Sequence, residues 1–306
     1  MSLSQLPRFM RALTCEPLAV ERGFLDAFVG VINLRAADGL SFTGADLHAE
    51  LGVPMPRAQG TGADGRIAVI PIMGAIANRA HSMGTGADRI AAMVDEAVNS
   101  ARVDGIVFDV HSPGGTVVGT PELADTIFRA SQVKPTASVA NGLMASAAYW
   151  AGAAANEVVV TPSGEIGGIG IIALHEDHAA DLEAKGIRVT EFSAGKYKTQ
   201  GAPWKALTEE DAAYMDSRVQ TAYDWFVKDV ARFRTREGRN VTPAAVRSGY
   251  GEGRALTAKD AVAAGLADRI DSLEGTIARM AAVTATKRRA RVSAEVEFRQ
   301  RTRARG

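Results

Sequence analysis

The chain has 306 residues, of which 46% are hydrophobic and 23% are charged, and its 35 basic side chains balance its 35 acidic ones. This composition excludes a largely disordered chain and gives no sign that the whole molecule binds nucleic acid or another highly charged partner. The charges are unevenly placed, because residues 287–306 hold eight basic and two acidic side chains, which leaves 27 basic and 33 acidic ones before them. The C-terminal tail is therefore a separate electrostatic region.

Cysteine usage and hydropathy limit the compartment. Cys15 is the single cysteine, which excludes an internal disulfide and fits a reducing environment. No apolar run approaches the roughly 18 residues that span a bilayer, and residues 1–7 lack a signal-peptide pattern. We expect the chain to stay where it is made.

The first 65 residues differ in composition from the rest of the chain. Residues 8–36 have an amphipathic helical pattern, and residues 52–65 are rich in glycine and proline, as in a linker. We predict three parts: a helical arm with its linker at 1–65, a main domain at 66–275, and a basic tail at 276–306.

Strands and helices alternate through the main domain. Strands are predicted at 66–72, 105–110, 136–140, 157–160 and 188–192, with a glycine-punctuated loop and strand within 165–174. Helices are predicted at 88–101, 120–130, 147–155 and 177–185, then after Thr208 and from Thr257 to Gly265, with a loop at 81–87. This alternation is typical of an α/β fold, and the continuous apolar content of 105–110 predicts a parallel sheet covered on both faces.

One serine stands among small residues between a predicted strand and a predicted helix. Ser146 follows the strand at 136–140 and precedes the alanine-rich run at 147–155. A serine in such a turn lies at the positive end of the helix dipole, where a developing oxyanion would be stabilised. We interpret Ser146 as a nucleophile, and the alternative is an ordinary helix cap or packing residue.

A glycine pair follows the strand at 105–110, in the segment Ser112-Pro-Gly-Gly115. Proline fixes the turn, and the two glycines expose backbone N–H groups with no Cβ in the way. This arrangement suits an oxyanion hole, in which loss of one donor costs roughly 3 kcal/mol of transition-state stabilisation. Taken alone, such a segment is more often a simple tight turn.

A lysine pair follows the predicted strand at 188–192, in Ser193-Ala-Gly-Lys196-Tyr-Lys198. A lysine can take a proton from serine only as a neutral amine, which requires a pKa about 3 units below the usual value of about 10.4. Burial at the mouth of an apolar sheet would supply that shift, whereas a solvated lysine is an ordinary surface charge.

Together these segments resemble the signal peptide peptidase A family of serine proteases, and most of all its bacteriophage branch of head-maturation or minor-capsid proteases. The matching segments are Val110-His-Ser-Pro-Gly-Gly115, Ala140-Asn-Gly-Leu-Met-Ala-Ser-Ala-Ala-Tyr-Trp150, 160–170, 193–198 and 253–268. The resemblance covers about residues 66–270.

The resemblance implies a role for each matching residue. It makes Ser146 the nucleophile, Lys198 the general base, Gly114 and Gly115 the source of one oxyanion donor, and Ala147 N–H the other. It implies no metal and no cofactor. It also implies the fold shared by Clp protease and crotonase, a spiral of strand-strand-helix units that assembles into rings, in which the lysine can serve the serine of an adjacent protomer. One position departs from the pattern, because this chain has Gly168 where many relatives have a hydroxyl residue that holds the lysine.

The function that this resemblance implies is a Ser-Lys endopeptidase that cleaves capsid or scaffold proteins during phage head maturation. Because of Gly168, a non-catalytic capsid or scaffold component with the same fold is the main alternative, and a bacterial signal-peptide-peptidase-like protease is another. The expected partners are a protein substrate and further copies of the chain, without a membrane span, in the host cytoplasm or the phage prohead.

Three further hypotheses remain open. A Ser-His-Asp protease would need one of the chain's histidines, of which His111 lies near the glycine pair and His175 and His178 flank two acidic residues. A crotonase-like acyl-CoA enzyme would use the glycine pair but has no need for serine and lysine together. The basic tail is either a solvated, disordered end or a contact for nucleic acid or an acidic partner.

Overall fold

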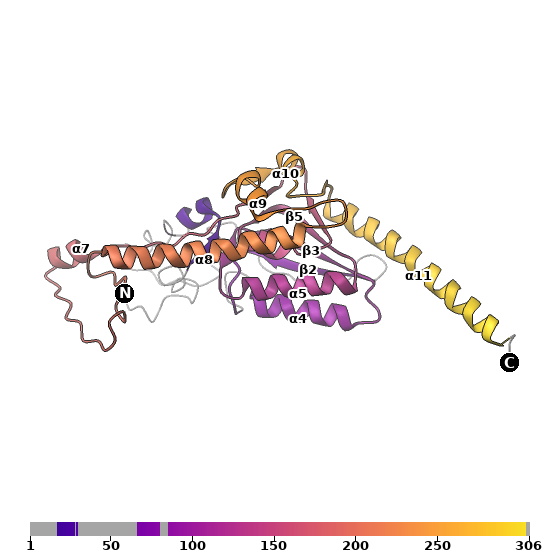
Figure 1. The fold of residues 1–306 in the computed structure, drawn as a ribbon, viewed down its shortest axis with the longest axis horizontal. Helices are drawn as coiled ribbons and strands as arrows, with labels where there is room; N and C mark the ends of the chain where they lie inside the picture. Colours follow the sequence, from indigo (N-terminus) through magenta and orange to yellow (C-terminus); the bar gives the residue numbers. More distant parts are fainter. Residues whose placement is uncertain (1–16, 28, 30–65, 80–84, 304–306) are drawn as a thin grey trace.

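The computed structural model describes residues 17–27, 29, 66–79 and 85–303, and Figure 1 shows their arrangement. Most of the predicted arm and linker, and most of the predicted loop at 81–87, lie outside the described residues. The described part is a mixed α/β fold with a mainly parallel sheet, which confirms the predicted class at that level.

Five parallel strands form the main path of the sheet, in the order β2-β3-β5-β6-β9. They are β2 (Ile67–Met73), β3 (Gly105–Ser112), β5 (Thr136–Ala145), β6 (Glu157–Val160) and β9 (Arg269–Ile270). The strand predictions at 66–72, 105–110, 136–140 and 157–160 are confirmed. Because the strands are parallel, their carboxyl ends meet at one edge, where Met73 pairs with His111 and Ser112 with Met144.

Short strands extend the sheet at this carboxyl edge. β7 (Glu165–Gly167) lies parallel to the end of β5, and β8 (Ala255–Thr257) lies antiparallel to β7. β4 (Gly114–Thr116) contains the glycine pair and forms a separate two-stranded antiparallel sheet with β1 (Leu18–Val20) from the N-terminal segment. The predicted helix at 8–36 is therefore wrong at 18–20, whereas residues 22–27 and 29 are helical.

Successive side chains along each strand point to opposite faces of the sheet, so each strand contributes to a core on both faces. Ile106 and Phe108 of β3 face the large core under the helices, and Val107 faces a smaller core with Met280. The helices over the large core are α4 (Ala87–Asn99), α5 (Thr120–Val133), α6 (Ala147–Gly152), α8 (Glu209–Arg234), α9 (Pro243–Gly249) and α10 (Ala258–Ala264). The first turns of α11 (Leu273–Arg303) cover the other face. Both faces of β3 are buried, as its apolar sequence predicted.

Helix ends follow the expected signals with one correction. The Thr208 side chain caps α8 by accepting a hydrogen bond from Asp211 N–H, and Gly265 ends α10 in the left-handed conformation, as predicted. At α5 the cap is Gly119 rather than Thr120, because Thr120 is already helical and its hydroxyl donates to the Thr116 carbonyl.

Two segments differ from the sequence prediction. Residues 188–192 form no strand and are exposed, although their β-branched side chains favour one. The basic tail is helical as far as Arg303 within α11, so the interpretation of a disordered end is wrong for these residues. Figure 1 shows α11 and the N-terminal half of α8, with α7 (Ala179–Ala184), extending away from the sheet in opposite directions.

Candidate active site

Ser146 occupies the turn between β5 and α6, as the sequence predicted. Its side chain is 1% exposed, and its backbone has φ 55° and ψ −118°, a left-handed conformation that costs a non-glycine residue free energy. Ser146 N–H donates to the Gly167 carbonyl at 2.7 Å, and its own carbonyl accepts from Trp150 N–H at 2.9 Å. The surrounding strands and helix therefore hold this serine in a strained position, which is typical of functional sites.

The glycine pair lies directly against this serine. A Cβ added to Gly114 would lie 2.9 Å from the Ser146 Cβ, and one added to Gly115 would lie 1.8 Å from the Ile76 carbonyl oxygen. Gly114 also has φ +102°, so both positions need a bare backbone. Gly114 N–H donates to the Ser112 hydroxyl at 3.2 Å. The structure thus brings Gly114 and Ser146 together. Ala147 is the first residue of α6, and its N–H lacks an acceptor within the helix.

Gly168 lies on another side of the serine. Its φ is +64°, its N–H donates to the Arg254 carbonyl at 2.9 Å, and an added Cβ would lie 3.3 Å from the Ser146 nitrogen. A hydroxyl residue at this position would need a left-handed backbone in contact with the serine. The Ser146 hydroxyl itself donates a long hydrogen bond, of 3.4 Å, to the carbonyl of Gly170.

The candidate lysine does not meet the serine within one chain. Lys198 is exposed in a series of turns, where its N–H donates to the Gly195 carbonyl, and no hydrogen bond among the described residues joins it to Ser146. The neighbouring Lys196 donates to the Tyr197 hydroxyl at 2.7 Å and to Glu210 at 2.9 Å. These hydrogen bonds raise the pKa of Lys196, which keeps it charged and unsuited to the role of a base.

The helix that follows Ser146 is anchored by residues that the sequence prediction did not single out. Trp150 stacks on Phe226 of α8, with ring centroids 4.5 Å apart and an interplanar angle of 4°. Its indole N–H donates to Asp229 at 2.9 Å. Tyr149 is fully buried, and its hydroxyl donates to the Leu266 carbonyl at 3.1 Å. The only sequence signal for these contacts was the pair of large aromatic residues within an alanine-rich run.

A buried ion pair lies behind this helix. Arg234, at the end of α8, is fully buried and donates to both carboxylate oxygens of Asp268, at 2.6 and 2.9 Å. Burial alone would raise the pKa of Asp268, but its hydrogen bonds and its attraction to Arg234 outweigh that effect and lower the pKa. The carboxylate also accepts from Val158 N–H of β6, so it ties α8 to the sheet.

The hydrogen-bond partners of His111 and His178 are residues other than Ser146. His111 Nδ1 lies 3.1 Å from the Asn141 carbonyl oxygen, and exposed His178 lies 3.2 Å from Glu176. None of the hydrogen bonds found in the described part of the chain joins a histidine to Ser146. Residues 17–27, 29, 66–79 and 85–303 also contain no group of three or more histidine, cysteine and acidic side chains with the geometry of a metal site.

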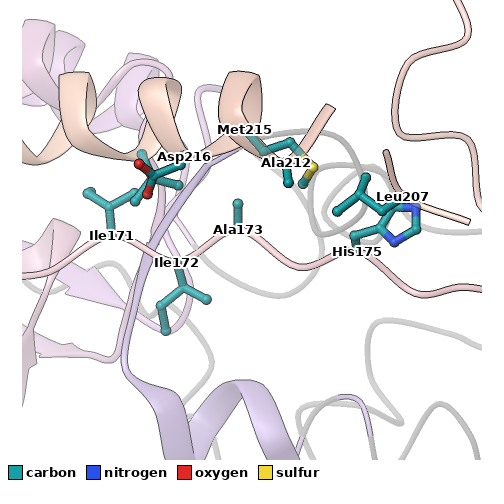
Figure 2. Close-up of a pocket in the computed structure, with 9 residues that line it drawn as sticks. Ile171, Ile172, Ala173, His175, Leu207, Ala212, Met215 and Asp216 are labelled. Atoms are coloured by element: carbon teal, nitrogen blue, oxygen red, sulfur yellow. The ribbon is translucent and has the colours of Figure 1, made fainter. Parts of the chain in front are cut away.

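A pocket of about 440 Å³ opens beside the segment that follows Gly170. It is lined by Ile171 to Ala173 and His175 on one side and by Leu207, Ala212, Met215 and Val219 on the other. Figure 2 shows the first segment running beneath the N-terminal half of α8, with the Ile172 side chain pointing away from that helix. The pocket thus lies between residues 171–175 and the N-terminal half of α8.

Comparison with known proteins identifies a peptidase family and several relatives. The family described as peptidase family S49 matches residues 129–287. The chain is 30% identical over 288 residues to capsid assembly protease C of Escherichia phage lambda, covering 88% of this chain and 64% of the relative. It is 30% identical over 220 residues to head-tail preconnector protein GP5 of Enterobacteria phage P21, covering 70% and 42%.

A third similarity lies outside the phages. The chain is 28% identical over 224 residues to the chloroplastic serine protease SPPA of Arabidopsis thaliana, covering 71% of this chain and 32% of the relative. The chain therefore spans less than two thirds of the length of these three relatives. Among the described helices, none combines the length and hydropathy needed to cross a membrane.

Proposed function

Because the chain belongs to peptidase family S49, we propose that it is a serine endopeptidase in which Ser146 is the nucleophile and Lys198 of an adjacent copy is the general base. The observation that carries the proposal is the strained, buried Ser146 at the start of α6, in contact with the glycine pair. The family membership itself supports a peptidase, and the motif resemblance supplies the Ser-Lys pair.

The reaction follows from the chemistry of these groups. The neutral Lys198 amine removes the Ser146 proton as the serine oxygen attacks the peptide carbonyl. One backbone N–H from the loop of Gly114 and Gly115 and the N–H of Ala147 are the proposed donors to the resulting oxyanion, and the positive end of α6 adds to their effect. The lysinium then protonates the leaving amine, and water repeats the cycle on the acyl-enzyme.

Assembly is part of the proposal, because Lys198 is exposed in one chain. An amine in water keeps its proton, so it needs a partner surface that buries it beside Ser146. We propose that this surface is a second copy, in a ring of the kind built by Clp/crotonase-like spiral folds. The substrate is then a capsid or scaffold polypeptide in the host cytoplasm or the prohead, by analogy with the two phage relatives.

The test is a set of three variants. Ser146→Ala and Lys198→Ala should each abolish cleavage of co-expressed capsid and scaffold proteins, read by mass spectrometry, while the oligomer stays intact. Lys196→Ala is the matched control and should cleave normally, because that lysine pairs with Glu210. Cleavage that persists with Ser146→Ala or Lys198→Ala contradicts the assignment.

A non-catalytic capsid or scaffold component is the second candidate, favoured by the exposure of Lys198 and by Gly168 in place of a hydroxyl residue. A fluorophosphonate probe separates the two, since it reacts only with an activated serine. Modification of Ser146 in the assembled protein supports the protease, and an unmodified serine in a well-folded assembly supports the structural role.

A further inference from the structure

Strand β1 lies between two segments of the candidate active site. On one side its residues pair with β4, Leu18 with Thr116, Ala19 with Gly115 and Val20 with Gly114. On the other side Leu18 N–H donates to the Ile172 carbonyl, and Ile172 N–H donates to the Leu18 carbonyl, both at 2.8 Å. Leu18, Ala19 and Val20 are at most 4% exposed, so the strand is held on both edges and buried.

Both neighbours of β1 are also neighbours of Ser146. A Cβ added to Gly114 would lie 2.3 Å from the Ala19 carbonyl oxygen and 2.9 Å from the Ser146 Cβ. On the other side, the Ser146 hydroxyl donates to Gly170, two residues before Ile172. One glycine backbone therefore separates β1 from the candidate nucleophile.

The pairing also involves a candidate oxyanion donor. Glu21 N–H donates to the Pro113 carbonyl, and Val117 N–H donates to the Pro17 carbonyl, at the two ends of the β1–β4 pair. In an antiparallel pair, hydrogen-bonded and non-hydrogen-bonded positions alternate, which makes Ala19 and Gly115 a hydrogen-bonded position. Gly115 N–H thus faces β1 in this arrangement.

We propose that β1 occupies the strand position of the polypeptide substrate and must leave it before a substrate can bind. An extended peptide that adds to two strand edges gains backbone hydrogen bonds on both sides, which is how proteins bind peptides of varied sequence. The position between β4 and Ile172 offers these edges beside Ser146. The proposal rests on the proposed protease function and adds an inhibitory role for residues 17–21 of the same chain.

The helical segment that follows β1 keeps this strand in its position. The Glu21 carboxylate accepts from Gly23 N–H at 2.9 Å and from Phe24 N–H at 2.8 Å, which caps the helical segment 22–27. Leu25 of that segment is fully buried and anchors it. The chain therefore turns into a helix directly after Glu21, which fixes the end of β1 beside Gly114.

A reversible disulfide tests the proposal in the full chain. Leu18 and Thr116 lie opposite each other at a non-hydrogen-bonded position, where Cα atoms are about 4.5 Å apart, within the range of a disulfide. In Leu18→Cys/Thr116→Cys, with Cys15→Ser to prevent mispairing, oxidation should lower the rate of casein cleavage at least tenfold. Reduction should restore it. The single Leu18→Cys variant, also with Cys15→Ser, is the control and should not respond to oxidation.

Each outcome bears on one proposal or the other. Equal cleavage by the locked and reduced forms means that β1 is a permanent wall of the site, which overturns the inference and leaves the protease intact. A disulfide that fails to form, judged by intact mass, contradicts the observed pairing and also overturns the inference. No cleavage by the reduced form and no fluorophosphonate on Ser146 overturns the proposed function, and the inference with it.

A second variant is designed to release β1 instead of locking it. It keeps the proposal testable if the double-cysteine variant misfolds. Glu21→Ala removes the cap of segment 22–27 and should release β1 more often, because lost caps shift such equilibria by about fivefold. We expect the initial rate of casein cleavage to rise by about fivefold. An unchanged or lower rate, with the thermal unfolding of the domain unaffected, contradicts an inhibitory role.

Discussion

The two halves of α8 share one apolar stripe but have different surroundings. In the C-terminal half, Ala222, Phe226, Val230 and Phe233 are buried where α8 packs against α5, α6 and α9. In the N-terminal half, Met215 and Val219 are only half-buried, and Tyr214 is 51% exposed. The spacing of three and four is the same throughout, so the pattern alone does not tell which half packs within the chain.

Ser146 and Lys198 lie near different halves of α8. The buried half supports α6 through Trp150, and the projecting half follows the exposed turns that contain Lys198. Figure 1 shows how far this half of α8 and α7 extend beyond the sheet. We expect a neighbouring copy to cover the projecting half, and in doing so to bring a lysine and a serine from different chains together.

Complementation between inactive chains gives the largest expected effect. Ser146→Ala and Lys198→Ala should each lower cleavage by about a thousandfold or more when assembled alone. Co-assembled, they should recover a substantial fraction of wild-type activity, because some sites then combine an intact serine with an intact lysine from the neighbour. The measurement is the cleavage rate of co-expressed mixtures at several ratios. Mixtures that stay inactive although both chains are present in one particle contradict a lysine acting between chains.

Truncation along the stripe of α8 compares its two halves directly. Phe226→Ala should lower the free energy of unfolding by about 3–5 kcal/mol, because it removes a buried ring that stacks on Trp150. Val219→Ala should cost less than about 1 kcal/mol in the isolated chain, since that side chain is half-exposed. Urea unfolding of dilute protein measures both. Equal costs would show that the N-terminal half is as well packed as the C-terminal half.

Charge removal on the same helix gives a second matched pair. Arg234→Ala leaves Asp268 without its main partner and should cost about 3–5 kcal/mol. Arg218 is exposed in the projecting half, and Arg218→Ala should change the free energy of unfolding by no more than about 0.5 kcal/mol. A small loss for Arg234→Ala would mean that Arg236 and Arg239, which lie 3.6 and 3.1 Å from the Asp268 carboxylate, replace the lost guanidinium.

Acid should weaken the attachment of the buried half of α8 to β6 through Asp268. The pKa of Asp268 is lowered from its ordinary value of 3.8, so its contribution is fully present above that pH and is lost as the pH falls through the folded-state pKa. We expect the free energy of unfolding to fall as the pH drops below 3.8, as measured by urea unfolding between about pH 2 and 6. Asp268→Asn should flatten this part of the profile, and an unchanged profile would contradict the role of the pair.

Local sequence signals predicted the turn at Ser146 and failed where partners are distant. Small residues around Ser146 indicated its turn, and the glycine pair indicated a close backbone contact, although the pair lies in strand β4 rather than in a tight turn. Strand β1 was mistaken for helix because its apolar residues fit a helical pattern, while its partners Gly115 and Ile172 lie far along the chain. Residues 188–192 have strand-like side chains but pair with no strand among the described residues.

The helical structure of the C-terminal tail and the ion pair of Arg234 and Asp268 were not predicted from the sequence. The end of α11 is highly charged, which favoured a disordered end as one of two interpretations, although Leu273, Met280 and Ala281 of the same helix pack against the sheet. The ion pair of Arg234 and Asp268 joins residues whose proximity depends on how α8 lies on the sheet. Whether the tail contacts nucleic acid stays a prediction.

The smallest expected effect comes from one hydroxyl on the nucleophile helix. Burial raises the pKa of Tyr149, so its hydroxyl stays protonated and donates to the Leu266 carbonyl at 3.1 Å. Tyr149→Phe should cost about 1 kcal/mol, because the buried carbonyl loses this donor. Tyr214→Phe, on the projecting half of α8, is the control and should be neutral, since that ring is half-exposed to water. Thermal unfolding measures both, and equal effects would mean that the Tyr149 hydroxyl adds nothing to the anchoring of α6, which would then depend on the Trp150 contacts with Phe226 and Asp229.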